Sequence, residues 1–80
     1  MISNRQIRAA RALLGWSQLV LAERAGVSPI TVKRLEASDD GFAARVATLA
    51  SVQDALEVAG VGFLEPAAGY RDGVQLRAGE

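Results

Sequence analysis

The sequence predicts a mainly α-helical domain of four to five short helices, followed by a short pair of β-strands at the C-terminal end. Apolar residues recur at helical spacing over most of residues 4–59, and serine and glycine stand where such segments would begin and end. After Gly60 the pattern changes to the short apolar runs of strands. We therefore expect residues 1–60 to form a helical domain and residues 61–80 to form a C-terminal β segment.

The first helix is expected over residues 4–14. Ser3 or Asn4 can cap its start, and Gly15 ends it. Its inward stripe consists of Ile7, Ala10 and Leu14.

The stretch from Trp16 to Ser38 divides into two short helices with a tight turn between them. Ser17 can cap the first, at about residues 17–25, and Gly26 suits the left-handed position at its end. Ser28 can cap the second, at about residues 28–37, and Pro29 fits its first turn, where a missing N–H costs nothing. The inward positions are Leu21, Ala22, Ala25, Val32 and Leu35. Two helices joined by a glycine-containing turn, the second carrying basic residues, describe a helix-turn-helix.

These residues resemble the lambda-repressor/Cro-type helix-turn-helix family, also called the xenobiotic response element family. Twelve residues match the family pattern at fixed spacing: Ser17, Gln18, Leu21, Ala22, Ala25, Gly26, Val27, Ser28, Thr31, Val32, Leu35 and Glu36. So many matches are far more specific than a short motif. The resemblance extends back through the first helix. Leu19 and Val20 depart from it, because the family usually has polar residues there, and they place two apolar side chains on an exposed helix start.

The resemblance implies a DNA-binding regulator whose recognition helix, at about residues 28–37, enters the major groove. Gln18 matches a position that holds a phosphate and can brace the recognition helix. Arg34 is the best candidate for a bidentate contact to guanine, and Pro29 and Ile30 offer apolar contacts to thymine methyl groups. The full set of expected DNA-binding residues is Gln18, Ser28, Pro29, Ile30, Thr31, Lys33, Arg34, Arg8 and Arg5. The alternatives are that Arg34 is a solvated surface residue and that Pro29 only starts the helix.

Arg11 has two interpretations. It could contact phosphate, or it could form the structural ion pair that the family commonly makes with the glutamate closing the recognition helix, here Glu36. We favour the ion pair. Trp16 is expected at the edge of the core rather than stacked on a base.

Composition excludes several classes of protein. There is no cysteine and no histidine, so disulfides, thiol nucleophiles, Ser-His triads and the usual zinc sites are ruled out. No apolar run approaches membrane length, and the start lacks the order of a signal peptide. We expect a protein that is not an enzyme, needs no cofactor or metal, and acts in a bacterial or phage-type cytoplasm, associated with the nucleoid when bound.

The net charge of zero conceals a division along the chain. Residues 1–36 hold six basic and two acidic residues, a net charge of +4, whereas residues 37–80 hold three basic and seven acidic residues, a net charge of −4. This asymmetry predicts one face that meets phosphate and another that points away from it. The alternative is a chance scatter of surface charge.

Beyond the motif, residues 37–41 are expected to form a surface loop and Phe42 to Val46 a helical turn. Thr48 is expected to cap another helix, which Gly60 closes. The apolar positions of that helix are Leu49, Val52, Leu56 and Ala59.

Residues 61–65 and 73–77 are expected to be strands. Their connection is too long for a simple two-residue hairpin; Gly69-Tyr70 could supply its turn, and Tyr70 would cover the hairpin. The apolar strand residues are expected to join two copies of the chain: Val61, Phe63, Leu64, Val74 and Leu76. The alternative is that the hairpin folds back onto its own helix at 49–59 and the dimer forms elsewhere, or only on DNA.

We therefore expect a homodimeric repressor that reads a palindromic operator in double-stranded DNA, with half-sites about one turn apart. A repressor is favoured because 80 residues leave no room for a sensory domain. The alternative is an antitoxin or antiactivator-type interaction module that also binds DNA, with Leu19 and Val20 contacting a partner protein.

Overall fold

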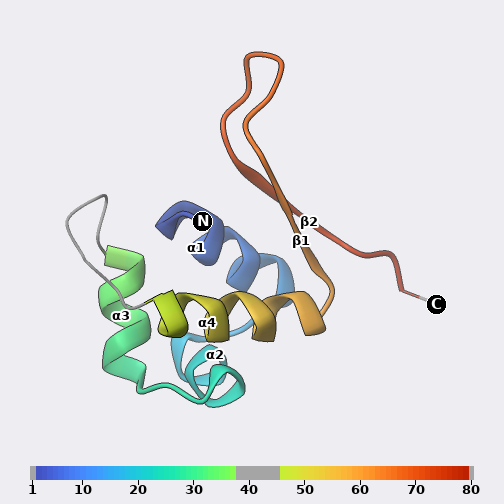
Figure 1. The fold of residues 1–80 in the computed structure, drawn as a ribbon. Helices are drawn as coiled ribbons and strands as arrows, with labels where there is room; N and C mark the ends of the chain where they lie inside the picture. The colour runs from blue at the N-terminus through green and yellow to red at the C-terminus, as the bar shows by residue number, and fades with distance from the viewer. Residues whose placement is uncertain (1, 38–45, 80) are drawn as a thin grey trace.

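The computed structural model describes residues 2–37 and 46–79. Their secondary structure consists of α1 (Asn4–Leu14), α2 (Gln18–Ala25), α3 (Pro29–Ala37), α4 (Val46–Val58), β1 (Val61–Leu64) and β2 (Gly73–Leu76). The helices pack together and the two strands form a hairpin that projects from them (Figure 1). The predicted fold class, mainly helical with a C-terminal strand pair, is confirmed. The helical turn expected over Phe42 to Val46 lies outside the described residues, except for Val46, which belongs to α4.

Local sequence signals set the ends of the first three helices. Ser3 and Gln6 form a capping box at the start of α1, and Gly15 ends the helix with a φ of 69°. The Ser17 hydroxyl accepts a hydrogen bond from the Val20 N–H at 3.1 Å, and the Ser28 hydroxyl accepts one from the Thr31 N–H at the same distance. These contacts begin α2 and α3 where the sequence predicts.

The core lies where α1, α2, α3 and α4 converge. Its fully buried members come from every helix and from the first residue of β1: Ile7, Ala10, Leu21, Ala22, Val32, Leu35, Val52, Leu56 and Val61. Trp16 packs against its edge, as expected, and the guanidinium carbon of Arg24 lies 5.3 Å from the Trp16 ring centroid.

The expectation that Thr48 caps the fourth helix is wrong. The helix already includes Val46, so Thr48 lies within it and is half-buried. A capping hydroxyl is a preference of helix starts rather than a requirement, and a threonine near a helix start does not have to be the cap.

The expectation that Val61 contributes to a dimer surface is also wrong. Only residues 59–60 separate the end of α4 from β1, so Val61 still lies over the helices and is buried in the core. Phe63 and Val74, which face each other in the antiparallel register, are half-buried against the same core. Leu64 and Leu76 remain exposed. The hairpin therefore folds back onto its own domain through Val61, Phe63 and Val74. The side chains of Leu64 and Leu76 do not take part in this packing.

The turn of the hairpin differs from the sequence-based expectation. Ala67 and Tyr70 exchange two backbone hydrogen bonds, at 3.1 and 3.0 Å, so the chain reverses at Ala68-Gly69 rather than Gly69-Tyr70. Both central residues have positive φ, 54° and 85°, the combination that type I′ hairpin turns require. Tyr70 follows the turn and is 80% exposed, so it does not cover the hairpin.

Gln6 anchors the hairpin to α1, a role that the sequence analysis did not predict. Its side chain is buried, and its amide nitrogen donates to the carbonyl oxygens of Leu64 at 3.2 Å and of Gly73 at 2.9 Å. Its amide oxygen accepts from the Ser3 N–H at 2.8 Å. One side chain thus completes the cap of α1 and holds the last strand pair of the hairpin.

The positive φ of Ala68 leads to a first prediction. A left-handed conformation costs an alanine about 1–2 kcal/mol, and asparagine tolerates it better. We expect Ala68→Asn to raise the free energy of unfolding by about 0.5–1 kcal/mol in urea denaturation. Ala67→Asn is the matched control, because Ala67 does not have a positive φ. An equal effect of both changes, or none at Ala68, would contradict the assigned turn.

Candidate nucleic-acid interface

A buried carboxylate at the end of α3 joins three helices. Glu36 is 3% exposed, and its carboxylate receives the Nε and Nη2 of Arg11 at 2.6 and 2.7 Å in a bidentate contact. The Gln18 amide donates to the same carboxylate at 3.1 Å. The side chains of α1 and the start of α2 therefore hold the last turn of α3 in a fixed position.

Two further contacts strengthen this cluster. Arg11 Nη1 donates to the carbonyl oxygen of Trp16 at 2.9 Å, which ties the connection between α1 and α2 to the ion pair. Arg8 Nη1 donates to the backbone carbonyl oxygen of Glu36. A cation at a helix C-terminus is favourable because the last carbonyl groups lack helical partners. The ion pair between Arg11 and Glu36, favoured from the sequence, is present.

The pKa of Glu36 is lowered by these contacts. Burial alone would raise it, but the hydrogen bonds from Arg11 and Gln18 and the positive charges of Arg11 and Arg8 outweigh that effect. The pKa of Arg11 is raised, chiefly by its hydrogen bond to Glu36. Both groups are therefore charged at neutral pH.

The outer surface of α3 carries the residues expected to meet DNA. Pro29, Lys33 and Arg34 are exposed, and Ile30, a large apolar residue with no core role, is 63% exposed. Thr31 is half-buried, with its hydroxyl 2.9 Å from that of Ser28. The start of α3 thus presents a mixed apolar and basic surface on a firmly held helix.

The remaining expected DNA-binding residues are more dispersed. Gln18 and Arg8 both lie against Glu36, close to the end of α3. Arg5 instead forms an ion pair with Asp72 on the hairpin, with 3.3 Å between Nη2 and Oδ1. The pKa of Asp72 is lowered, chiefly by a hydrogen bond from the Ser3 side chain and further by the hydrogen bond and the charge of Arg5. No sequence signal predicted the pairing, since the two residues are 67 positions apart.

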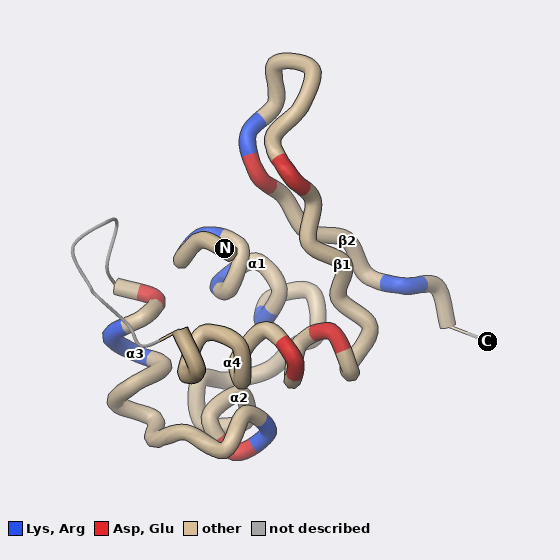
Figure 2. Tube along the Cα trace, viewed as in Figure 1, with Lys and Arg blue, Asp and Glu red and all other residues tan. Residues whose placement is uncertain are grey.

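The charge division along the sequence is only in part a division between the described elements of the fold. In Figure 2 basic residues lie on α3 at the left, whereas the hairpin that projects at the top carries basic as well as acidic residues. The hairpin holds two acidic residues, Glu65 and Asp72, and two basic ones, Arg71 and Arg77, so phosphate would be attracted by the basic residues of α3 without being repelled by a net charge of the hairpin.

The fold and this surface define a helix-turn-helix DNA-binding module. A family model described as helix-turn-helix matches residues 7–60, more than half of the chain, and the protein belongs to this lambda-repressor/Cro-type family. It is therefore a DNA-binding transcriptional regulator of a generally non-enzymatic family. The comparison with curated proteins gives no match.

Within residues 2–37 and 46–79, no helix is long and apolar enough to cross a membrane. The same residues contain no group of three or more potential metal ligands of the acidic, histidine or cysteine type.

The lowered pKa of Glu36 leads to a second prediction. A carboxyl group whose pKa is lower in the folded state stabilises that state above its unfolded pKa, about 4.3, and this contribution disappears as the pH falls through the folded value. We expect Glu36→Gln to lower the free energy of unfolding by about 1.5–3 kcal/mol at pH 7, the range for hydrogen bonds to a charged group.

The difference between wild type and variant should shrink as the pH is lowered from about 5 towards 3. Glu23→Gln, at an exposed position on α2, is the control and should show no comparable loss. Urea titrations at several pH values provide the measurement. A difference that stays constant into acid would show that the charge of Glu36 does not stabilise the fold.

Proposed function

We propose that this regulator is a repressor that binds a palindromic operator as a homodimer and reads base sequence with α3. One observation carries the proposal: α3 presents an exposed surface of apolar and basic residues, and the buried ion pair between Arg11 and Glu36 holds the same helix in place. A rigid recognition helix is suited to reading base edges, because each bidentate contact requires defined geometry. Binding in the cytoplasm of a bacterial or phage-type system would block transcription by occupying the operator.

Within α3, the roles follow from side-chain chemistry. Arg34 is exposed and can make a bidentate contact to O6 and N7 of guanine. Ile30 and Pro29 supply apolar contacts to thymine methyl groups. Lys33, Thr31 and Ser28 provide donors for bases or phosphates near the start of the helix.

The start of α2 is the proposed phosphate anchor. The Gln18 amide nitrogen has two hydrogens, and the contact with Glu36 uses one of them. The other can donate to a phosphate oxygen, beside the free N–H groups of the helix start. Gln18 would then link phosphate binding to the position of α3. Arg8 and Arg5 add sequence-independent attraction, although both also hold parts of the fold together.

The proposed homodimer is supported by the hairpin. One recognition helix covers only a few base pairs, so an operator of useful length requires two. Leu64 and Leu76 are 43% and 44% exposed, and Phe63 and Val74 are only half-buried. A second copy would cover these side chains and the open edges of a two-stranded sheet.

A third prediction tests the reading role of α3. We expect Arg34→Ala to weaken operator binding by about 1–3 kcal/mol and to relax the preference at one base pair. Arg24→Ala removes the same charge from a residue that lies over Trp16, and it should leave base preference unchanged. Binding to an operator and to its single-base variants, at two salt concentrations, provides the measurement. Equal losses on specific and random DNA would exclude Arg34 as a base reader.

A second candidate function is binding of a partner protein, as in an antitoxin or antiactivator. The observation that favours it is Leu19, an apolar residue that is 54% exposed near the start of α2. Val20, expected to be exposed as well, is half-buried, so Leu19 would carry most of such a contact.

The fourth prediction concerns this exposed leucine. Leu19→Glu should change the free energy of unfolding by less than about 0.5 kcal/mol, whereas Leu21→Glu should unfold the protein because Leu21 is fully buried. Circular dichroism and urea titration would distinguish these results. Leu19→Glu should also leave operator binding unchanged and reduce only the binding of a protein partner. Loss of folding in this variant would place Leu19 in the core and remove it as a docking residue.

A further inference from the structure

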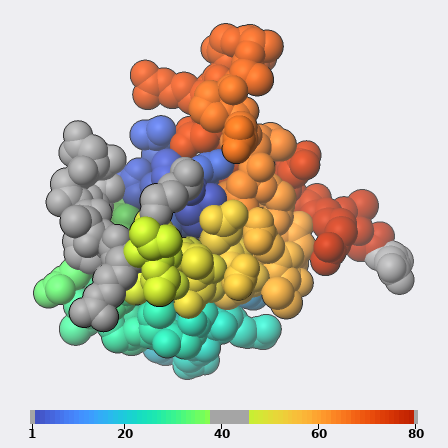
Figure 3. All heavy atoms as spheres, viewed as in Figure 1, coloured from blue at the N-terminus to red at the C-terminus, as the bar shows by residue number. Residues whose placement is uncertain are grey.

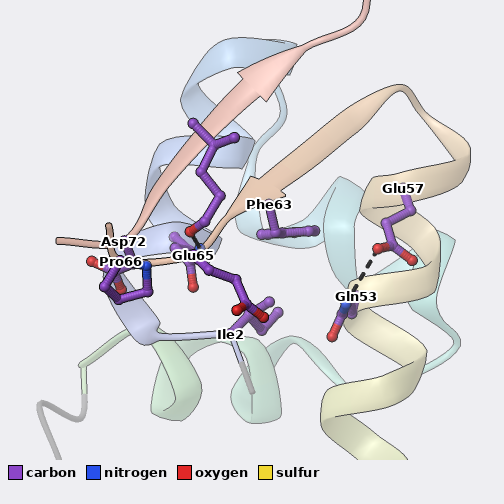
Figure 4. A pocket seen from close by; sticks show the side chains of 9 residues that line it. Ile2, Gln53, Glu57, Phe63, Glu65, Pro66 and Asp72 are labelled. Atoms are coloured by element: carbon purple, nitrogen blue, oxygen red, sulfur yellow. Dashed lines mark hydrogen bonds between the residues drawn. The ribbon is translucent and has the colours of Figure 1, made fainter. Parts of the chain in front are cut away.

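A groove of about 490 Å³ lies at the foot of the hairpin, between β1, α4 and the first residues of the chain (Figure 4). Its apolar wall and two of its three carboxylates are provided by Ile2, Phe63, Leu64, Pro66, Glu57 and Glu65. A groove of this kind can accept a side chain that is apolar along its length and positively charged at its end.

Two of the three carboxylates that line the groove, those of Glu57 and Glu65, form no ion pair among the described residues. The Glu57 carboxylate accepts a hydrogen bond from the Gln53 amide at 3.2 Å, and the two ion pairs found in residues 2–37 and 46–79 do not involve Glu57 or Glu65. The third acidic residue of the lining, Asp72, is occupied by Arg5. The groove is therefore acidic, which disfavours DNA phosphate or an acidic peptide as its occupant.

The turn end of the hairpin, directly beyond the groove-lining residues Pro66 and Asp72, has complementary chemistry. Next to the turn, Tyr70 is 80% exposed and Arg71 is also exposed, and neither lines the groove of its own chain. Figure 3 shows this end of the hairpin standing clear of the helical body. Two backbone hydrogen bonds close the turn of the tip, and the contacts of Gln6 hold the last strand pair, from which the tip projects. An exposed tyrosine beside an arginine is typical of the residues enriched at protein interfaces.

We infer that the groove binds the hairpin tip of a second copy of this chain, with Tyr70 on the apolar wall and Arg71 beside Glu57 and Glu65. A projecting tip and a groove at the foot of the same hairpin are self-complementary under a two-fold axis. When one tip enters the partner's groove, the symmetry places the partner's tip in the first groove. Charge complementarity thus selects the occupant. The inference rests on the proposed homodimer and names the contacts that form it.

Two variants, used separately and together, test this exchange. Arg71→Glu places an acid at the tip, and the double change Glu57→Arg, Glu65→Arg places bases in the groove. Each variant alone would bring like charges together in both contacts of its homodimer, so we expect its dimer dissociation constant to rise about 10-fold or more. A mixture of the two variants restores opposite charges in both contacts. It should therefore form a heterodimer with nearly the wild-type dissociation constant.

Sedimentation equilibrium of the full chain over a range of concentrations measures these constants, and circular dichroism verifies folding. Arg77→Glu, at an exposed position on the same hairpin, is the matched charge control and should dimerise as the wild type does. If a charge reversal prevents folding, the neutral changes Arg71→Gln and Glu65→Gln replace it, each with a smaller loss of dimer.

Variants that dimerise like the wild type would overturn the groove contact and leave the homodimer intact. Failure of the mixture to recover dimerisation would likewise overturn the reciprocal pairing of Arg71 with the groove. A wild-type chain that remains monomeric at high concentration would overturn both the homodimer and the groove contact.

Discussion

The arrangement of the helices depends on one ion pair, between Arg11 of α1 and Glu36 of α3. A carboxylate that is 3% exposed is tolerable only when its charge and its hydrogen-bonding capacity are both satisfied, and Arg11 and Gln18 satisfy them. Removing one partner would leave the other partly buried and uncompensated. Local sequence signals determine where each helix begins and ends, but they do not place the helices relative to one another. The cluster does so by joining α1, the start of α2 and the end of α3. As a result, α1 and α2 hold α3, and its outer surface, in a fixed position.

The helix α1 connects this support with the hairpin. Near its start, Gln6 holds the carbonyl groups of Leu64 and Gly73, and further along Arg8 and Arg11 hold the end of α3. The proposed reading surface and the proposed dimer element are therefore both fixed to the same helix. In a two-fold dimer, such a connection would define the distance between the two recognition helices and hence the spacing of the half-sites.

The sequence predicted what depends on neighbours in the chain. Caps such as Ser17 and Ser28 and the end of α1 at Gly15 follow from local chemistry, and the ion pair of Arg11 with Glu36 followed from the family resemblance.

Contacts between distant segments of the chain could not be predicted from the sequence in this way. The burial of Val61 depends on the short connection after α4, and the turn at Ala68-Gly69 contains an alanine where glycine or asparagine is usual. The role of Gln6 requires knowledge of where the hairpin docks. Among the expected DNA-binding residues, the structure brings Gln18 and Arg8 together but pairs Arg5 with the hairpin.

The proposed function requires that two copies of α3, each held by the ion pair between Arg11 and Glu36, read a symmetric operator. Selection of bound sequences from a pool of random double-stranded DNA, with the full chain at near-physiological salt, tests it most directly. We expect enriched sites with two inverted half-sites centred about one helical turn apart, each containing a guanine suited to Arg34. Enrichment of a single asymmetric half-site, or of no sequence at all, would contradict it.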